Sequence, residues 1–410
     1  MSENARKPSI RFAGFDDAWE QRKAKAIFKT LADKGYPELP VLSASQEFGM
    51  INRTETGINI HHDTRNEIGY KRVQPGQFVI HLRSFQGGFA HSGIEGITSP
   101  AYTVMEFQEK EVHYDYFWKY IFNSEAFIRR LELITYGIRD GRSISFEDFS
   151  TLDFYYPIYK EQKRIGLYFQ ELDSLITLHQ RKYDKLVSVK KSMLEKMFPK
   201  NGSNIPEIRF AGFDNTWEQR KLGELLDFSN GFNGGQELYG RGIRFISVMD
   251  ILNNKFITYD VILGSVNLDP TNKSNERFLV RYGDIVFQRS SENVEDAGKS
   301  NVYMDKEKPA AFGGFVIRGK KIAVYEPIFM KYVLDGKFVR NQIMSVAQGA
   351  QHINVGQEAL RNILVSLPKA DEQKSIGSFF LEIDNLITLH QRKLEKLKNI
   401  KKSMLEKMFV

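Results

Sequence analysis

The chain has 410 residues, with 58 Lys or Arg against 51 Asp or Glu, and it contains no cysteine. This length suggests about two to four domains. The lack of cysteine excludes a disulfide framework, a thiolate zinc site, an iron–sulfur cluster and a cysteine nucleophile. We expect no signal peptide, because no apolar stretch follows the first seven residues. We expect no membrane span, because no apolar run approaches ~18 residues. The net charge of +7 points only weakly to a polyanionic partner.

The chain repeats itself in two segments. Ile10–Lys23 matches Ile208–Lys221 at 12 of 14 positions, and Glu161–Phe198 matches Glu372–Phe409 at 27 of 38 positions. Repeats of this length indicate an internal duplication. Each half therefore consists of a short motif, a long variable region and a long repeated segment.

The first variable region, residues 24–156, is predicted to mix strands and helices. Runs of apolar and β-branched residues favour strands at Gln77–Leu82 and Ala101–Phe107, and the aromatic-rich stretch Tyr114–Leu133 favours a helix. After Pro157, which keeps the chain extended, apolar residues recur every three or four positions. That spacing predicts a helix of ~35 residues, about 50 Å long.

A stretch rich in Pro, Gly, Asn and Ser from Pro199 to Pro206 predicts a linker between the two halves. The second variable region, residues 222–367, shows the same mixed pattern, and a second long helix is expected after Pro368. The elements predicted in this region are strands at Asp284–Phe287 and Phe315–Ile317 and a short helix at Pro327–Leu334.

The two long helices are expected to pack on each other. A lone amphipathic helix of this length must bury its apolar stripe, and its own copy is the simplest partner, which gives an intramolecular coiled coil. The residues expected in this packing are Leu172, Leu175, Leu186, Met193, Ile383, Leu386, Leu397 and Met404.

The variable regions share a faint pattern that suggests one fold with two different surfaces. In Gly76–Ser84 and in Gly283–Ser290, a glycine turn leads into a strand that ends in Arg-Ser. Arg, Gln and Ser side chains can bind base edges or phosphates, although each one alone could equally be a solvated loop residue. The candidate DNA contacts are Lys71, Arg83, Ser84, Gln86, Arg139, Arg142, Arg289, Ser290, Ser291, Lys299, Gln348, Gln351 and His352.

Catalytic motifs are missing. The sequence contains neither the GxxxxGK[ST] phosphate loop nor the Asn-Pro-Pro-aromatic or Asp-Pro-Pro-aromatic tetrapeptide of adenine methyltransferases. A nuclease cluster of Asp284, Glu295 and Lys299 would require unusual spacing. The sequence His61-His62-Asp63 could bind a metal, but a surface turn is the simpler interpretation. We therefore expect no catalytic residue and no metal site.

Two repeated aromatic positions have both a functional and a structural interpretation. Trp19 and Trp217 could stack on a base, but their place in a repeated framework motif favours core packing. His179 and His390 could form a pH-sensitive or metal site, whereas a polar layer that fixes helix register is the alternative that we favour.

At this point the arrangement resembles the specificity subunit of type I restriction–modification enzymes. The resemblance rests on the repeated RFAGF-x-x-x-WEQRK motif, the segment Gly93–Tyr102, the Pro-x-x-x-Glu-Gln-Lys that precedes each long helix, and the two Leu-Ile-Thr-Leu-His-Gln-Arg-Lys segments. It covers nearly the whole chain.

The resemblance implies an α+β fold with pseudo-two-fold symmetry, in which two similar target recognition domains each read one half of a bipartite double-stranded DNA target. It implies that the long helices pack antiparallel and set the spacer. Two modification subunits would bind S-adenosylmethionine, and restriction subunits would use ATP and Mg, so that this chain binds no cofactor itself and acts in the cytoplasm. The implied divisions are two recognition domains (1–157 and 208–368), two spacer helices (158–198 and 369–410) and a linker (199–207).

A different class remains open, a pseudosymmetric scaffold that presents two protein-binding domains and no DNA site; an enzyme acting alone is disfavoured by the missing motifs. Charge does not separate these classes. Each long repeated segment has eight Lys or Arg against five Asp or Glu, so the two segments hold six of the seven excess charges. The interpretation as a DNA reader therefore depends on the duplication and the resemblance rather than on bulk charge.

Overall fold

The computed structural model describes residues 7–45, 48–56, 64–81, 88–134, 144–200, 203–349 and 352–410. The chain divides into two compact units. Unit 1 is Met1–Gln180 with Gln391–Val410, and unit 2 is Arg181–His390. Both divisions fall inside the long helices, so each unit contains one variable region and one part of each helix.

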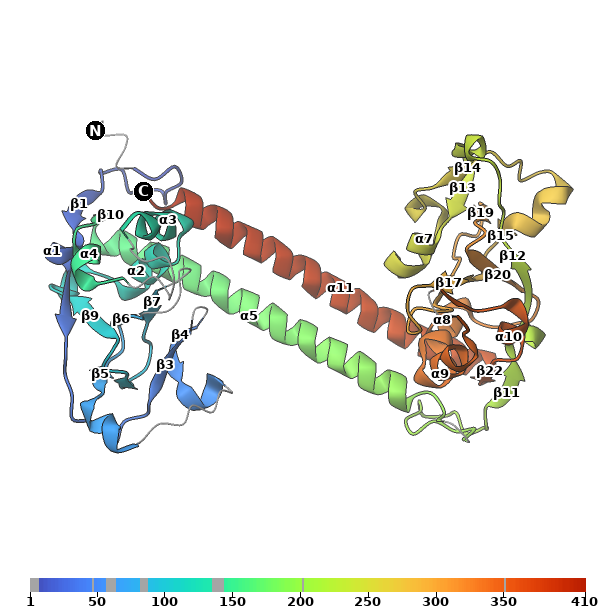
Figure 1. Cartoon of the computed structure of the whole chain (residues 1–410), viewed down its shortest axis with the longest axis horizontal. Coiled ribbons are helices and arrows are strands. Elements are labelled where there is room, and N and C mark those ends of the chain that lie inside the picture. Colours follow the sequence, from blue (N-terminus) through green and yellow to red (C-terminus); the bar gives the residue numbers. More distant parts are fainter. Residues whose placement is uncertain are drawn as a thin grey trace. The chain divides into compact units, whose positions relative to one another are not determined.

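Unit 1 is built around a four-stranded antiparallel sheet with strand order β2-β9-β6-β7 (Figure 1). Three two-stranded sheets, β1-β10, β3-β4 and β5-β8, complete it. The strands are β1 (Glu20–Lys23), β2 (Phe28–Leu31), β3 (Leu42–Ser45), β4 (Gly49–Asn52), β5 (Lys71–Val73), β6 (Phe78–Ile80), β7 (Phe89–His91), β8 (Gly96–Thr98), β9 (Thr103–Phe107) and β10 (Asp153–Tyr156). The short helices are α1 (Ala24–Ile27), α2 (Asp115–Phe122), α3 (Glu125–Ile134) and α4 (Phe146–Ser150).

Unit 2 contains the equivalent antiparallel sheet, β12-β20-β16-β18, and a second four-stranded sheet, β14-β13-β19-β15. Two-stranded sheets β11-β22 and β17-β21 accompany them. The strands are β11 (Glu218–Lys221), β12 (Leu226–Asn230), β13 (Tyr239–Ile246), β14 (Ser265–Val266), β15 (Leu279–Val280), β16 (Ile285–Gln288), β17 (Ser290–Ser291), β18 (Ser300–Val302), β19 (Ala310–Phe312), β20 (Val316–Lys321), β21 (Ile353–Asn354) and β22 (Leu364–Leu367). The short helices are α6 (Leu222–Leu225), α7 (Val248–Asn253), α8 (Pro327–Asp335), α9 (Lys337–Val346) and α10 (Gln357–Arg361).

The glycine-led strands of the sequence pattern hold the same place in the two sheets. Strands β6 and β16 are each third in strand order. Gly76 and Gly283, which precede them, both have φ of +85°, a conformation that favours glycine. The backbone N–H of each glycine donates to a carbonyl oxygen at 2.8 Å, that of Ser92 and that of Tyr303 respectively. The prediction that the variable regions share one fold is confirmed at this core.

One predicted helix is wrong in extent. The stretch Tyr114–Leu133 forms two helices, α2 and α3, rather than one. The break lies at Ser124, whose hydroxyl donates to the Ile121 carbonyl at 2.7 Å and accepts from the Phe127 N–H at 3.2 Å. A serine in this role starts a new helix by satisfying a backbone donor of its first turn.

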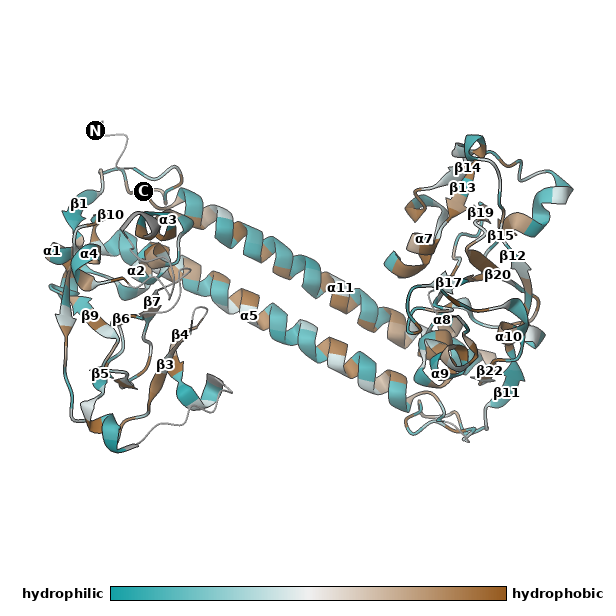
Figure 2. Cartoon of the chain, viewed as in Figure 1, coloured by the Kyte–Doolittle hydropathy of each residue, from teal (hydrophilic) through white to brown (hydrophobic). Residues whose placement is uncertain are grey.

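The two long helices are α5 (Tyr159–Lys196) and α11 (Ala370–Lys407), each of 38 residues. Figure 2 shows brown apolar residues recurring along both helices among teal polar ones. In unit 1, Phe169 of α5 stacks on Phe409, beyond the end of α11 (centroids 5.8 Å apart), and the later residue Asp173 pairs with the earlier residue Lys401. In unit 2, Lys190 pairs with Asp384, and Phe198 stacks on Phe380. Within each unit the helices therefore run antiparallel, as predicted.

Two of the expected helix-packing residues are not packed. Leu175 and Leu386 are 37% and 38% exposed. The buried stripe of α5 follows Ile165, Phe169 and Leu172, and continuing this spacing leads to Ile176 rather than to its neighbour Leu175. Of the other expected residues, Leu172 and Ile383 are buried, and Leu186, Met193, Leu397 and Met404 are half-buried.

The short repeated motif fastens each variable region to the helices. The Arg11 guanidinium donates to both carboxylate oxygens of Glu161 at 2.7 Å, and Arg209 makes the same two bonds to Glu372 at 2.6 and 2.7 Å. Beside them, the backbone N–H of Ile10 donates to the carbonyl of Lys407, at the end of α11. The last turn of the chain thus completes unit 1, and the last turn of α5 completes unit 2 in the same way, with the Ile208 N–H on the carbonyl of Lys196.

The repeated tryptophans are core residues, as favoured. Trp19 is 1% exposed and lies edge-on to Phe117 with centroids 5.7 Å apart. Trp217 is 2% exposed and meets Phe329 in the same way at 5.8 Å. Neither indole is available to stack on a base.

His113 makes unit 1 sensitive to acid. Its ring is 7% exposed, stacks on Phe107 at 5.0 Å, and has no hydrogen-bond partner at Nδ1. Burial lowers the pKa of His113 to about 4. Since the unfolded chain takes up this proton near pH 6.5, stability is complete above pH 6.5 and declines as pH falls toward 4, by up to about 3 kcal/mol.

We expect His113→Phe to remove the loss of stability that His113 causes between pH 6.5 and pH 4, because phenylalanine keeps the aromatic packing and cannot be protonated. Urea unfolding of both proteins at pH 7.5 and pH 5 measures it. An equal loss of stability on acidification in the two proteins would contradict the assignment to His113.

Candidate nucleic-acid interface

Two candidate segments far apart in the sequence meet in unit 2. Strand β17 pairs antiparallel with β21, with Ser290 opposite Asn354 and Ser291 opposite Ile353. Gln348 continues the pairing through two backbone hydrogen bonds with Asn354, of 3.0 and 2.7 Å. We call the surface made by Arg289–Ser291, Gln348 and His352–Asn354 the Arg289 edge. Sequence patterns supplied both segments, but only the fold brings them together.

Arg289 is the exposed cation of this edge, and its backbone is held on both sides. Its N–H donates to the Phe315 carbonyl at 2.9 Å, and its own carbonyl accepts from the Val355 N–H at 2.9 Å. The guanidinium makes one long hydrogen bond, 3.4 Å, to the carbonyl of Gly314. The side chain therefore starts from a fixed backbone position and keeps donors for another partner.

The two serines of the edge differ. Ser290 is half-buried, whereas Ser291 is 6% exposed and its hydroxyl donates to the Asn293 carbonyl at 2.7 Å. Ser291 thus shapes the following loop and does not present its hydroxyl at the surface, contrary to its selection as a contact.

The Lys299 ammonium pairs with the Asp296 carboxylate and lowers the pKa of that carboxyl group.

Gly349, which directly follows Gln348 of the Arg289 edge, allows a tight turn. Gly349 has φ of +134°, and a Cβ there would lie 2.0 Å from the His352 carbonyl oxygen. No larger residue fits without moving the backbone. His352 follows with an exposed side chain. Gln351 lies outside the described residues.

Sequence reasoning missed Phe315. Its ring is 71% exposed and follows Gly313 and Gly314 in the loop between β19 and β20. Its carbonyl accepts the N–H of Arg289, so an exposed aromatic ring and an exposed arginine leave neighbouring backbone positions. The sequence did contain a signal for an exposed ring here: two glycines precede an aromatic residue, and apolar segments flank all three. An aromatic ring at such a place can contact a thymine methyl group or stack on a base.

Of the candidate DNA contacts in unit 1, only Lys71 lies among the described residues. The Lys71 ammonium is half-buried and donates to the Tyr102 carbonyl at 2.6 Å. Burial, and secondarily the nearby Lys34, lowers the pKa of Lys71. Lys71 therefore ties β5 to the backbone just before β9 rather than offering a free ammonium group, a correction to its choice as a contact. The remaining choices in this unit, Arg83, Ser84, Gln86, Arg139 and Arg142, lie outside the described residues.

The catalytic alternatives find no support among the described residues. Asp284 is 4% exposed, and its carboxylate accepts from the backbone N–H groups of Lys321 and Arg281 at 2.9 and 3.0 Å. It therefore orders the turn before β16 instead of joining Glu295 and Lys299. Across the described ranges, no group of three or more His, Asp or Glu is placed to hold a metal ion, and no helix is long and apolar enough to cross a membrane. The His61-His62-Asp63 segment lies outside those ranges.

The Arg289 edge carries side-chain types that can form hydrogen bonds with bases. Arginine donates two bonds to guanine, glutamine pairs with adenine, and a carboxylate accepts from cytosine. The edge offers Arg289, Gln348 and His352, and the adjoining loop adds the exposed carboxylates of Glu292 and Glu295. Such a mixture suits hydrogen bonding to base edges better than uniform attraction to phosphates.

Comparisons with known proteins concern the family and the fold of the chain. The sequence family described as "Type I restriction modification DNA specificity domain" matches residues 214–399. The type I restriction enzyme MjaVIII specificity subunit of Methanocaldococcus jannaschii is 23% identical over 259 residues, which make up 61% of this chain and 59% of that relative. The alignment thus spans about three-fifths of the length of the curated relative.

Solved structures show the same fold over nearly the whole chain. The type I restriction–modification S subunit from M. genitalium superposes with a TM-score of 0.58 at 14% identity, covering 98% of this chain and 99% of that one. A chain from a study of assembly and conformational transition in the type I R-M system gives 0.51 at 15% identity, covering 95% and 97%. Residues 214–399 thus match the family of type I restriction modification DNA specificity domains, and the whole chain shares the fold of the solved S subunit.

Proposed function

We propose that this protein is the sequence-specific DNA-recognition subunit of a type I restriction–modification complex, with each variable region reading one half of a bipartite double-stranded target. The observation that carries the proposal is the duplicated frame with differing surfaces. The repeated Arg–Glu pairs and the sheet order are the same in both units, whereas the second sheet, β14-β13-β19-β15, is described only in unit 2. One frame that presents two different surfaces suits two different half-targets.

The repeated helices suit a partner that docks twice. Leu175 and Leu178 on α5 are 37% and 45% exposed, and their equivalents Leu386 and Leu389 on α11 are 38% and 44% exposed. Identical exposed leucines on each helix offer the same apolar contact to two copies of one protein. We propose that these copies are the two modification subunits, and that restriction subunits join the complex.

The chain itself would be non-catalytic. We propose that S-adenosylmethionine binds the modification subunits and that ATP and Mg bind the restriction subunits, with no cofactor on this chain. The complex would act in the cytoplasm, where its DNA target is found. The lack of methyltransferase and phosphate-loop motifs in the sequence is consistent with this division of labour.

The long helices would set the distance between the half-targets. A helix of 38 residues is about 57 Å long, somewhat over one turn of duplex DNA at ~34–36 Å. The proposed divisions are recognition domains at 1–157 and 208–368, spacer helices at 158–198 and 369–410, and a linker at 199–207. The spacer should be strict in length and indifferent to base identity.

Arg289→Ala tests the proposal at the Arg289 edge. Loss of a base-reading arginine should cost about 1–3 kcal/mol of discrimination at one base pair. With cognate modification subunits, mapping of methylated adenines by long-read sequencing should show relaxed base identity in one half-target and an unchanged other half.

Arg361→Ala is the matched control, because it removes an arginine from the same unit whose partner, Asp227, is exposed. It should leave the methylated motif as in the wild type. An Arg289→Ala complex with a wild-type motif would remove Arg289 from the recognition surface. A wild-type complex that methylated no split motif would contradict the proposed function itself.

A further inference from the structure

One aspartate on each long helix is a meeting point of three elements. Asp173 on α5 and Asp384 on α11 are equivalent positions in the repeat. The Tyr120 hydroxyl of α2 donates to Asp173 Oδ2 at 2.8 Å, and the Tyr332 hydroxyl of α8 donates to Asp384 Oδ2 at the same distance. The tyrosines are 1% and 2% exposed. Each bond thus fastens a long helix to a helix of its own variable region, at a depth where other partners are scarce.

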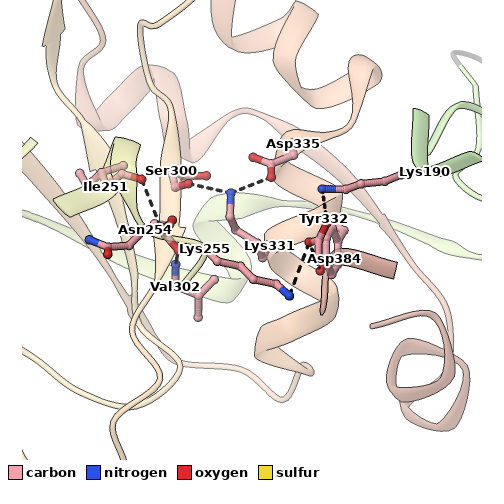
Figure 3. Close-up of polar contacts among 11 residues, drawn as sticks. Lys190, Ile251, Asn254, Lys255, Ser300, Val302, Lys331, Tyr332, Asp335 and Asp384 are labelled. Carbon is pink, nitrogen blue, oxygen red and sulfur yellow. Dashed lines mark hydrogen bonds and ion pairs between the residues drawn. The ribbon is translucent and has the colours of Figure 1, made fainter. Parts of the chain in front are cut away.

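The opposite helix supplies a lysine to each aspartate. Lys401 of α11 lies 2.5 Å from Asp173 Oδ1, and Lys190 of α5 lies 2.7 Å from Asp384 Oδ1. These lysines are also equivalent in the repeat, and each ammonium lies 5.7 Å from the centroid of the tyrosine ring of its cluster. We call each Tyr–Asp–Lys set a node. Figure 3 shows the node of unit 2, with Lys190 directed at Asp384 beside Tyr332.

The node of unit 2 extends into the variable region. The Lys255 ammonium donates to Asn385 Oδ1 at 3.0 Å and to the Leu381 carbonyl at 3.2 Å, and lies 4.0 Å from Asp384 Oδ2 (Figure 3). Lys255 directly follows Asn254, whose carbonyl accepts from the buried Asn301 side chain at 2.7 Å. The segment after α7 is therefore held both to the sheet, through β18, and to α11.

Directional bonds define register where an apolar stripe does not. A heptad-like stripe presents similar apolar residues on every turn. Sliding one helix along the other by a turn therefore changes the apolar packing between them little. A slide of one turn, about 5.4 Å, would carry each lysine out of reach of its aspartate. A polar contact at one position of such a seam is an effective means of specifying register.

We infer that the Tyr–Asp–Lys nodes are positioning elements that hold α5 and α11 in one register and so fix the spacer length of the DNA target. This inference rests on the proposed function. These residues act on the spacer through the position of the two helices, not through bases. Removing a node widens the range of spacer lengths that the complex accepts and leaves the base identities of both half-targets unchanged.

Lys190→Ala tests the inference, since it removes the cross-helix bond from a side chain that is 29% exposed, so the chain should still fold. In complexes with cognate modification subunits, mapping of methylated adenines should show sites with spacers one base pair longer or shorter at about tenfold higher frequency than in the wild type. Tyr332→Phe, which removes only the hydroxyl, should shift the spacer distribution in the same direction. Lys190→Arg should keep the single wild-type spacer length, because arginine keeps the positive charge and the hydrogen-bond donor.

Lys191→Ala is the matched control, an exposed lysine one position along α5, and it should leave the spacer unchanged. A purely stabilising role for the node would lower total methylation without changing spacer lengths, and that result would overturn the inference. A single wild-type spacer in both Lys190→Ala and Tyr332→Phe would do the same. If the wild-type complex itself showed no split motif with a fixed spacer, the proposed function would fail and not merely the node.

Discussion

Replacing Arg11 by methionine should destabilise unit 1 by about 3–5 kcal/mol, because the variant leaves a buried carboxylate without its partner. The Glu161 side chain is 0% exposed, and both of its oxygens accept from the Arg11 guanidinium. Arg209→Met should have a similar effect on unit 2, where Glu372 is 1% exposed. Urea unfolding followed by a probe in each unit measures the two effects separately.

Two variants separate this effect from a general loss of charge. Arg22→Met removes an arginine that is 54% exposed in the same unit, and it should change stability little. The double variant Arg11→Met with Glu161→Leu should recover most of the stability, since apolar residues of similar size can replace a buried ion pair. Equal effects of Arg11→Met and Arg22→Met would show that the pair does not hold the motif to α5.

Deleting the last three residues, Met408–Val410, should open unit 1 and spare unit 2. Met408 is 3% exposed in the core that also contains Trp19, and the Phe409 ring lies 5.5 Å from that of Phe117. Losing a buried methionine and a packed phenylalanine costs roughly 5 kcal/mol or more, which approaches the whole stability of a typical domain. Limited proteolysis with mass spectrometry should locate the new cleavages in unit 1, although the deletion is at the opposite end of the sequence.

Removing only Val410, which is 38% exposed, is the matched control and should leave the cleavage pattern unchanged. Phe198→Ala makes the corresponding change at the end of α5, where the ring meets Trp217, and it should loosen unit 2 instead. If the three-residue deletion left both units equally protected, the residues that follow α11 would not be part of the N-terminal fold.

The sequence pattern predicted the frame well because the frame is local and repeated. Helix-spaced apolar residues led to α5 and α11, and the glycine-led strands led to β6 and β16. The failures have equally physical causes. Ser124 ends one helix and begins another through its own hydroxyl, which a count of apolar residues does not register. Leu175 lies beside the buried stripe because the stripe steps four residues from Leu172, to Ile176, rather than three.

The candidate interface was predictable only in part. Residue chemistry selected Arg289 and Gln348, but no local signal shows that segments some 60 residues apart pair as β17 and β21. The same reasoning wrongly selected Lys71 and Ser291, whose side chains are used inside the fold. It missed Phe315, since exposure of an aromatic ring depends on what the rest of the chain covers.

Exchange of one variable region shows whether each variable region reads its own half-target. Residues 24–156 would be replaced by the corresponding region of a type I specificity subunit, and the proposed complex with modification subunits would be examined by long-read mapping of methylated adenines. If each variable region reads one half-target, one half of the split motif changes completely, while the other half and the spacer length stay as in the wild type. A motif that is indifferent to the exchange, or one in which both halves change together, would contradict it.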